Sequence, residues 1–407
     1  MRTRRPPVPV YLWLTGVSAA CYALAFTLNL VYQVEVIGLS PLQLVLVGTV
    51  LEASVFVGEV PTGIVADVYS RRLSILIGLV LVGAGLALCA VPSFAAVLAG
   101  QVLWGVGYTF TSGAQQAWIT DEIGTEHVGS VFVRATQLRM AGTIAGIVLA
   151  GALGLLWIGL PIVVGGAGFV VLAAVLALVM PEHGFTPVRS ADRTTWATMA
   201  AQFRAGLALA RQRRVVRALM LVSLIGGLAS EAFDRLWVVH VLDIGLPPLL
   251  GVSDEVVWFA AIGLAGTLLS LVVSLVVNLV FPRTLAALHP ARLLAALTLV
   301  EVVAVAAFAL TGRFWLALAM LWLRSAVQVV VEPVSEAWMN RNVSSDVRAT
   351  VLSFEGQLNA IGQVGGGPAL GAVGSAVSVR AALLGSALTL LPAAGVLATT
   401  RTDPPPQ

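Results

Sequence analysis

Several charged side chains stand inside long apolar stretches of the sequence. The clearest are Glu52, Glu231, Asp234 and Arg324, each with apolar stretches on both sides. A charge at the centre of a membrane costs at least about 2.5–3.5 kcal/mol, so each such residue requires a partner or a purpose. Carboxylates bind and release protons, and a nearby arginine favours their ionised form. We therefore select these four residues as candidates for proton coupling.

The sequence leaves the pairing of these charges open. Glu231 and Arg235 are four residues apart and can pair on one helix face. Alternatively, Arg324 bridges to Glu231 from another helix, and the cluster serves either as structural ion pairing or as a proton or substrate coupler. Glu52 has no arginine on its own apolar stretch, so it is our first choice for a protonatable group, with a hydrogen-bonded structural carboxyl as the alternative. Glu301 lies in a further apolar stretch, and the sequence gives no account of it.

The composition indicates which elements must position these groups. The chain has 407 residues, of which 58% are hydrophobic and only 11% charged, whereas a soluble domain carries about 25% charged residues. The apolar runs are long enough to span a bilayer as helices, and polar and apolar positions do not alternate as in a membrane barrel. Inside a bilayer, helices satisfy their own backbone hydrogen bonds. The sequence therefore predicts a multi-spanning, all-α membrane protein.

Apolar runs separated by polar breaks predict twelve transmembrane helices. They cover residues 10–32, 42–66, 73–91, 94–118, 131–156, 159–180, 215–239, 255–281, 291–311, 314–339, 348–373 and 378–399. Short turns join several neighbouring helices, which favours two compact bundles of six helices each.

The placement of the arginines predicts the orientation. All 23 basic residues are arginine. With twelve spans, most of those outside the apolar runs fall on one side of the membrane, and only Arg313 and Arg380 mark the other. Because arginine-rich loops are cytoplasmic, both termini are expected inside the cell. The formal charge of +3 reflects this topology and gives no indication of nucleic-acid binding.

The long polar stretch at 181–214 divides the chain into three parts. We predict an N-terminal six-helix half at 1–180, a cytoplasmic linker at 181–214, and a C-terminal six-helix half at 215–407. Within the linker, apolar residues recur at helical spacing, which favours an amphipathic helix on the inner membrane surface, with a solvated linker as the alternative. These residues are Trp196, Met199, Phe203 and Leu207.

Two stretches, one in each half, resemble one another. Ala117-Trp118 matches Ala337-Trp338 at an offset of 338 − 118 = 220 residues. Arg134-Ala135-Thr136 matches Arg348-Ala349-Thr350 at 348 − 134 = 214, which aligns Gly142 with Gly356. Parallel repeats of this kind place a substrate site between the halves, near the middle of the membrane. Chance similarity of so short a block is the alternative.

The segment after the second predicted helix reads Gly-Ile-Val-Ala-Asp-Val-Tyr-Ser-Arg-Arg and starts at Gly63. It resembles the signature between helices two and three of the major facilitator superfamily, with Gly63, Asp67, Arg71 and Arg72 at matching positions. The resemblance implies two pseudo-symmetric six-helix bundles and a gating latch between Asp67 and the start of helix eleven, where Arg348 stands. Gly63 is expected to allow close helix approach. The alternative is that both arginines only set topology.

Within this superfamily, the chain looks most like the bacterial macrolide and tetracycline drug exporters, which implies the bacterial inner membrane. Three departures bear on mechanism. Val68 and Ser70 replace an arginine and a glycine of the signature, and Gln101 stands where drug–proton antiporters commonly carry an arginine. Their helix-five proline is also missing, although a comparable Gly367-Pro368 occurs in helix eleven.

Aromatic and amide residues of the first and fourth predicted helices are candidates for a substrate cavity. Stacking and apolar contact suit bulky hydrophobic compounds, and ordinary helix packing is the alternative for each residue. The candidates are Tyr22, Asn29, Gln101, Trp104 and Tyr108.

The leading hypothesis is a secondary active transporter that exports drug-like hydrophobic or amphipathic compounds with the proton gradient, by alternating access. The alternatives are an uptake symporter or facilitator for a small nutrient or osmolyte, and a non-transporting membrane sensor or scaffold. We find no nucleophile elbow, diphosphate motif or cluster of metal ligands, so we expect no enzyme activity, metal or cofactor. The expected partners are a small-molecule substrate, protons and the lipid bilayer, and the expected state is a monomer.

Overall fold

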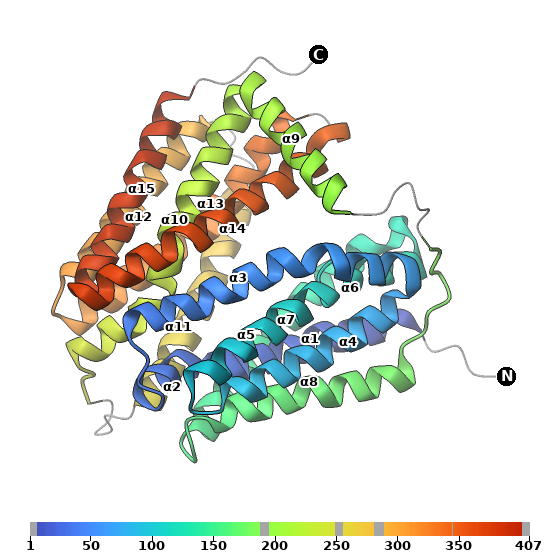
Figure 1. The fold of residues 1–407 in the computed structure, drawn as a ribbon, viewed down its shortest axis with the longest axis horizontal. Coiled ribbons are helices and arrows are strands. Elements are labelled where there is room, and N and C mark those ends of the chain that lie inside the picture. The colour runs from blue at the N-terminus through green and yellow to red at the C-terminus, as the bar shows by residue number, and fades with distance from the viewer. Residues whose placement is uncertain (1–5, 188–194, 249–254, 281–288, 344, 401–407) are drawn as a thin grey trace. The chain divides into compact units, whose positions relative to one another are not determined.

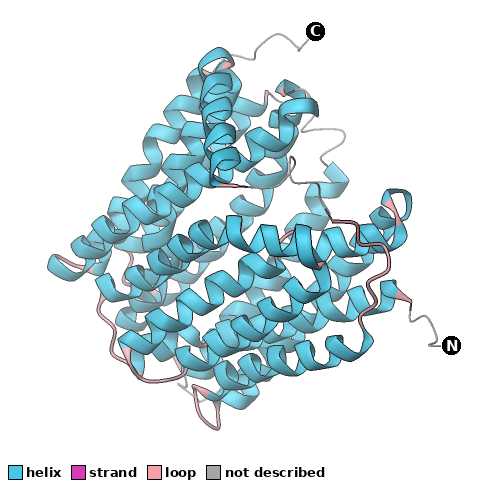
Figure 2. Cartoon of the chain, turned by 45° about the vertical axis from the view of Figure 1, so that its right-hand side comes forward, coloured by secondary structure: helices cyan, strands magenta, loops and turns pink. Residues whose placement is uncertain are grey.

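The structure, a computed structural model, is helical throughout the residues it describes, which are 6–187, 195–248, 255–280, 289–343 and 345–400 (Figures 1 and 2). In this part of the chain there is no strand, and eleven helices are long and apolar enough to cross a membrane. A further long helix, Ser345–Ala376, carries several glycines and amide residues. The predicted class, a multi-spanning all-α membrane protein, is confirmed. Some arginines used for orientation lie outside the described residues, namely Arg2, Arg4, Arg5, Arg189, Arg193, Arg283 and Arg401.

The chain forms two compact units. Unit 1 comprises Met1–Gly38, Val50–Trp196 and Asp254–Leu264. It therefore contains most of α3 (Pro41–Ile64) and the first part of α11 (Glu255–Val280). Its other helices are α1 (Pro7–Phe26), α2 (Asn29–Glu35), the π-helix η1 (Val65–Tyr69), α4 (Arg71–Cys89), α5 (Phe94–Thr111), α6 (Ala114–Ile123), α7 (Thr125–Gly154) and α8 (Leu160–Val179).

Unit 2 comprises Leu39–Thr49, Ala197–Ser253 and Ala265–Gln407. It takes in the start of α3 and the rest of α11. Its other helices are α9 (Trp196–Gln212), α10 (Arg214–Ile244), α12 (Pro290–Leu310), α13 (Phe314–Asn342), α14 (Ser345–Ala376) and α15 (Val379–Thr399). The predicted halves and the linker at 181–214 stay a prediction, because each unit contains one part of α3 and one part of α11.

Two predicted helices are interrupted in the structure. The first span, expected at 10–32, breaks between α1 and α2 at Thr27–Leu28. The span expected at 94–118 breaks between α5 and α6, where Gly113 adopts φ = 70°. A positive φ is readily adopted by glycine, which has no Cβ to clash with the backbone. This glycine therefore lets the chain start a new helix in another direction.

A helix, α9, occupies part of the predicted linker, and one face of it packs within unit 2; its predicted place on the membrane surface stays a prediction. Met199 is buried, and the ring of Phe203 meets Phe354 of α14 edge to face with centroids 4.7 Å apart. Gly206 lies directly against Phe354. Trp196, in contrast, is 51% exposed. α9 is therefore anchored to α14 by its apolar face.

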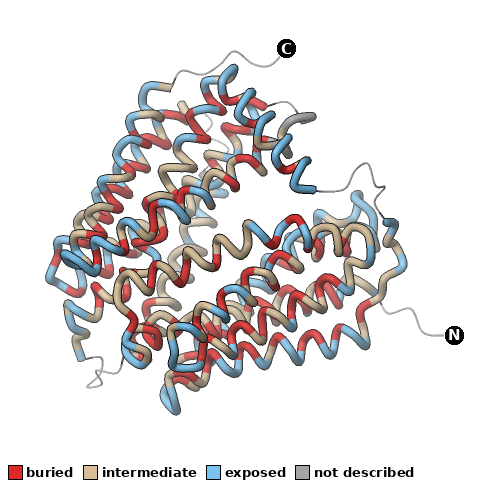
Figure 3. The backbone as a smooth tube through the Cα atoms, viewed as in Figure 1, coloured by how far each residue is buried: buried red, intermediate tan, exposed pale blue. Residues whose placement is uncertain are grey.

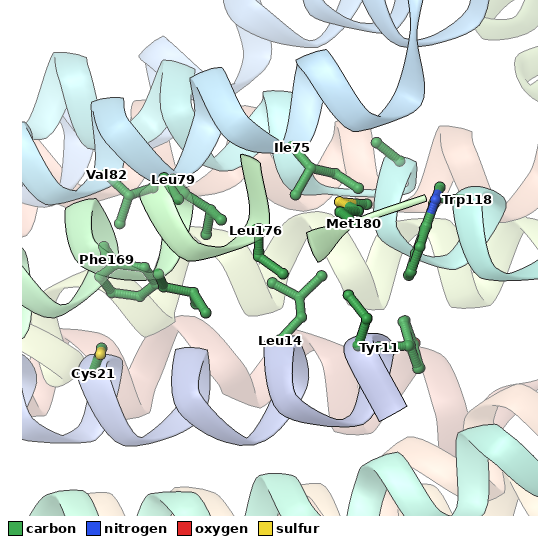
Figure 4. Close-up of a cluster of buried hydrophobic side chains, with 14 of the residues drawn as sticks. Tyr11, Leu14, Cys21, Ile75, Leu79, Val82, Trp118, Phe169, Leu176 and Met180 are labelled. Atoms are coloured by element: carbon green, nitrogen blue, oxygen red, sulfur yellow. The ribbon is translucent and has the colours of Figure 1, made fainter. Parts of the chain in front are cut away.

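The core of unit 1 is a cluster of buried apolar side chains from α1, η1, α4, α6, α7 and α8, part of which Figure 4 shows. Tyr11, Trp118 and Phe169 are its largest members, and the Tyr11 and Trp118 rings lie 6.5 Å apart. Buried and exposed residues alternate along the helices (Figure 3). Some of the exposed side chains are large and apolar, such as Leu178 of α8 at 84% and Leu279 of α11 at 79%. Such positions suit contact with lipid tails.

In unit 1, glycines bring the backbones of α1 and α7 into direct contact. A Cβ added at Gly142 would overlap the carbonyl oxygen of Gly16, and one at Gly146 would overlap that of Ala20. Small residues at such a contact let two membrane helices approach closely. The one-turn spacing of the two glycines keeps both on the same helix face.

Unit 2 contains the same arrangement between α10 and α14. A Cβ at Gly362 would overlap the carbonyl oxygen of Leu224, and one at Gly366 would overlap that of Leu228. The two glycines are again one helical turn apart. Each unit thus contains at least one helix pair held together through backbone contact at glycines.

These contacts correct the predicted register of the repeat. They make Gly142 equivalent to Gly362 and Gly146 equivalent to Gly366, and both pairs have an offset of 220 (362 − 142 and 366 − 146). This is the offset of the Ala-Trp pair. Gly356, which the Arg-Ala-Thr match aligned with Gly142, faces open space. The 214-residue alignment, which rested on the short Arg-Ala-Thr match, was therefore wrong at this position.

Candidate functional site

A cavity of about 700 Å³ lies within unit 2 among α10, α12, α13, α14 and α15. Its volume is in the range of small-molecule sites, about 300–1,000 Å³. α13 lines it with Arg324, Gln328, Glu332 and Glu336. Residues four apart lie above one another on a helix face, so the sequence of α13 alone directs this polar row toward one side.

Arg324 is the centre of an ion cluster on the cavity wall. Its Nη1 lies 3.2 Å from Oδ1 of Asp234, and its Nε lies 3.4 Å from Oε1 of Glu301. The guanidinium also stands over the Phe233 ring, 4.2 Å from the centroid, in a cation–π contact. Gln328 donates a hydrogen bond of 2.6 Å from Nε2 to Oε1 of Glu301. The cluster therefore joins α10, α12 and α13.

The cluster contains one positive and two negative formal charges. Glu301 is buried, with 8% of its side chain exposed, whereas the side chain of Asp234 is 50% exposed. In a low-dielectric surrounding, an unbalanced charge is costly. One added proton makes the three groups electrically neutral, so the geometry suits a site that takes up and releases a single proton.

Glu231 belongs to a separate pair. Its Oε1 accepts a hydrogen bond of 2.8 Å from Nε of Arg235, as the four-residue spacing predicts. The Glu231 carboxyl lies directly against Gly48, where any side chain would overlap it. The sequence alternative, in which Arg324 bridges to Glu231, is therefore wrong, because Arg324 contacts Asp234 and Glu301 instead. Glu52 is half-buried on α3.

A second cavity, of about 310 Å³, lies within unit 1 among α1, α4, α5, α6, α7 and α8. Two of the predicted cavity residues, Tyr22 and Tyr108, line it, together with Arg139 of α7. Ser18 also lines it, and its buried hydroxyl makes no hydrogen bond to any described residue. This cavity is smaller and more aromatic than the one in unit 2.

The other three predicted cavity residues pack between helices and do not line this space. Asn29 is buried and accepts a hydrogen bond of 3.3 Å from Nε2 of Gln33. Gln101 is fully buried, and its Nε2 lies 3.4 Å from Sγ of Cys89. The ring of Trp104 lies tilted by 40° against that of Phe26, with centroids 4.6 Å apart. Polar residue type alone did not distinguish cavity lining from interhelical hydrogen bonding.

The signature segment forms a charge network at the junction of α3, η1 and α4. Nη1 of Arg71 lies 2.7 Å from Oδ1 of Asp67, and its Nε lies 2.8 Å from Oδ2 of Asp121 at the end of α6. A Cβ at Gly63 would meet no heavy atom within 4 Å in the described structure. The predicted close approach at Gly63 stays a prediction. The latch between Asp67 and Arg348 stays a prediction.

Glu182, which sequence reasoning missed, ties the segment after α8 to the start of α4. Its Oε2 accepts a hydrogen bond of 2.6 Å from the Ser70 hydroxyl, and its Oε1 accepts one of 2.8 Å from the backbone N–H of Arg72. Ser70 in turn caps α4 by accepting from the N–H of Leu73. A carboxylate at a helix N-terminus is favoured by the helix dipole. Ser70, which departs from the family signature, thus has a structural role. Nearby, Nη2 of Arg72 donates a hydrogen bond to the carbonyl of Ala177.

Replacing Ser70 with alanine is expected to lower the free energy of unfolding by about 1–2 kcal/mol, because it removes the cap and one bond to Glu182. The apparent melting temperature of the detergent-purified protein measures this. Ser93→Ala is the matched control, since Ser93 occupies the N-cap of α5 without a side-chain cap bond. Equal melting of the two variants would show that the Ser70 bonds contribute nothing.

Comparison of the chain with known proteins identifies its family. Residues 12–288 match the model of the Major Facilitator Superfamily, which is more than half of the chain. An uncharacterized MFS-type transporter, YxaM of Bacillus subtilis (strain 168), is 29% identical over 115 residues. That match spans 28% of each chain.

Solved structures of low sequence identity share the fold. A point mutant of the nucleoside transporter NupG matches with a TM-score of 0.76 at 15% identity, covering 97% of this chain and 99% of that one. A bacterial homologue of the human lysosomal transporter Spinster, in an inward-facing and unoccupied conformation, matches at 0.72 and 15% identity, covering 98% and 97%. A POT family transporter in complex with a thioalcohol-conjugated peptide matches at 0.76 and 12%, covering 96% and 95%. The chain belongs to the Major Facilitator Superfamily and is a multi-pass membrane transporter.

Proposed function

We propose that this transporter exports drug-like amphipathic compounds across the bacterial inner membrane, driven by the proton gradient through alternating access, with both termini in the cytoplasm. The observation that carries the proposal is the Arg324 cluster on the wall of the 700 Å³ cavity. It combines a space of substrate size with carboxylates able to bind a proton. The resemblance to drug exporters supports the outward direction.

In the proposed cycle, Glu301 or Asp234 takes up a proton and weakens its contact with Arg324. The two carboxylates share one arginine, so adding a proton to one of them leaves the other as the partner of Arg324. Substrate in the adjoining cavity then meets an altered wall charge, and release of the proton restores the cluster. Glu52 remains the second candidate for proton coupling, while Glu231 is assigned to the structural pair with Arg235.

Everted vesicles from a pump-deficient bacterium test both direction and coupling. An imposed proton gradient is expected to drive dyes and antibiotics of a substrate panel into the vesicles, and a proton uncoupler is expected to abolish this uptake. Substrate leaving the vesicles under the same gradient would contradict export and indicate the uptake alternative.

The coupling residues are tested in the same vesicles. Glu301→Gln is expected to lose gradient-driven transport while retaining substrate counterflow, because counterflow requires binding but no net proton movement. Glu52→Gln tests the second candidate for proton coupling by the same two measurements. Glu126→Gln is the matched control, since Glu126 is exposed on α7 and lines neither cavity. Full gradient-driven transport in both the Glu301 and Glu52 variants would exclude these two residues and leave Asp234 as the group that takes up the proton.

A further inference from the structure

The cavity of unit 2 carries a surplus of negative charge. Besides Asp234 and Glu301, which share Arg324, three further carboxylates line it: Glu332, Glu336 and Glu355. In the described part of the chain, none of these three lies within salt-bridge distance of a basic side chain. We propose, resting on the transport function inferred above, that the cavity recognises amphipathic cations whose charge sits on a group with N–H donors, such as a protonated amine or a guanidinium.

The three carboxylates lie together on facing helices. Glu332 and Glu336 are one turn apart on α13, and Glu355 of α14 is near enough to Glu336 for their charges to interact. Glu332 and Glu336 are exposed and Glu355 is half-buried, so their carboxylates are open to a ligand in the cavity, and like charges near one another repel. A ligand cation placed among them supplies the missing opposite charge.

The chemistry of the lining favours an organic cation over a metal ion. The described residues contain no group of three or more His, Cys, Asp or Glu side chains that could hold a metal. The carboxylates that line the cavity therefore do not converge on one point as the ligands of a metal ion do. The space of about 700 Å³ also contains apolar wall residues, among them Leu219, Val305 and Leu390. Such residues suit the apolar body of a larger molecule.

The same lining favours N–H cations over quaternary ammonium groups. Quaternary ammonium is bound through aromatic faces, and none of the described residues that line this cavity is aromatic. Carboxylate oxygens, by contrast, accept charge-assisted hydrogen bonds from N–H donors, which are about twice as strong as neutral ones. A cation that can donate hydrogen bonds therefore gains an interaction that a trimethylammonium group lacks.

The cavity of unit 1 provides a comparison within the same molecule. Among the described residues that line it, Arg139 is the one with a charge, and the others are aromatic, hydroxyl, amide or apolar. A cation gains nothing from such a charge. The preference for cations is therefore specific to the unit 2 cavity and is not expected of the unit 1 cavity.

A matched series of fluorescent ligands tests the proposal on the purified full-length protein in detergent. The series shares one dansyl-alkyl body and differs at its end: a primary amine (dansylcadaverine), its trimethylammonium derivative, and its neutral N-acetyl derivative. We expect the amine to bind at least tenfold more tightly than the N-acetyl compound, with the trimethylammonium compound between them. The triple variant Glu332→Gln/Glu336→Gln/Glu355→Gln is expected to reduce the amine's affinity at least tenfold and to leave the N-acetyl compound unchanged, and Glu126→Gln is expected to change neither.

Each outcome decides the proposal. Equal binding of the amine and the N-acetyl compound, a trimethylammonium compound that binds most tightly, or absence of binding by every charged member overturns it. Unchanged amine binding in a folded triple variant also overturns it. If that variant does not fold, the ligand series on the unmodified protein decides alone. Because these are equilibrium measurements without a gradient, amine-selective binding without proton-driven vesicle transport would refute the proposed coupling and leave the cation preference standing.

Discussion

Replacing Arg324 with glutamine is expected to destabilise the protein by about 3–5 kcal/mol and to abolish transport. The variant removes the partner of Glu301, whose side chain is only 8% exposed, and leaves a buried carboxylate without its counter-charge. It also removes the cation–π contact with Phe233. Most of the cost comes from Glu301, because the half-exposed Asp234 can be solvated. Thermal unfolding of the purified protein and vesicle transport measure the two effects.

The double variant Arg324→Gln/Glu301→Gln separates the charge effect from lost packing. Removing both charges leaves no unpaired buried ion, so most of the stability is expected to return while gradient-driven transport stays absent. Arg380→Gln is the matched control, since Arg380 is exposed at the start of α15. If the double variant is as unstable as Arg324→Gln, the ion pair is not what stabilises these three helices.

Adding a single methyl group at Gly362 is expected to cost about 3 kcal/mol or more, whereas the same change at Gly356 of the same helix is expected to be neutral or stabilising. The Cβ of Gly362→Ala would overlap the carbonyl oxygen of Leu224, so α10 and α14 must separate along their contact. Gly356 faces open space, and there alanine improves helix propensity by about 1 kcal/mol. Apparent melting temperatures of the two variants provide the comparison.

The same contrast is expected in unit 1. Gly142→Ala should destabilise through its overlap with Gly16, and Gly129→Ala, also on α7 but facing open space, should not. If all four alanine variants melt together, the backbone contacts are less tight than the structure indicates. A loss at Gly356 instead of Gly362 would restore the 214-residue register of the repeat.

Much of the helical layout was predictable, because apolar runs about 20 residues long have few folded alternatives in a bilayer. The break at Gly113 had a signal in its glycine, which tolerates the positive φ found there. The break at Thr27–Leu28 contains neither glycine nor proline, so nothing in the local sequence marked it.

The candidate site was predictable only where partners are close in sequence. The Glu231–Arg235 pair follows from four-residue spacing on one helix. The contact between Glu301 and Arg324 joins α12 to α13, and no local rule specifies which faces of two different helices meet. For the same reason the sequence did not explain Glu301 and missed Glu182, whose bonds reach residues more than 100 positions away.

The glycine contacts of α1 with α7 and of α10 with α14 also limit how these helices can move. Sliding α7 along α1 by one turn would bring either Leu138 to the place of Gly142 or Ala150 to the place of Gly146, where no Cβ fits. The two helices of each pair therefore keep their relative position and move as one stiff unit. Any bending during a transport cycle therefore falls on positions outside these contacts, such as the break between α1 and α2 at Thr27–Leu28.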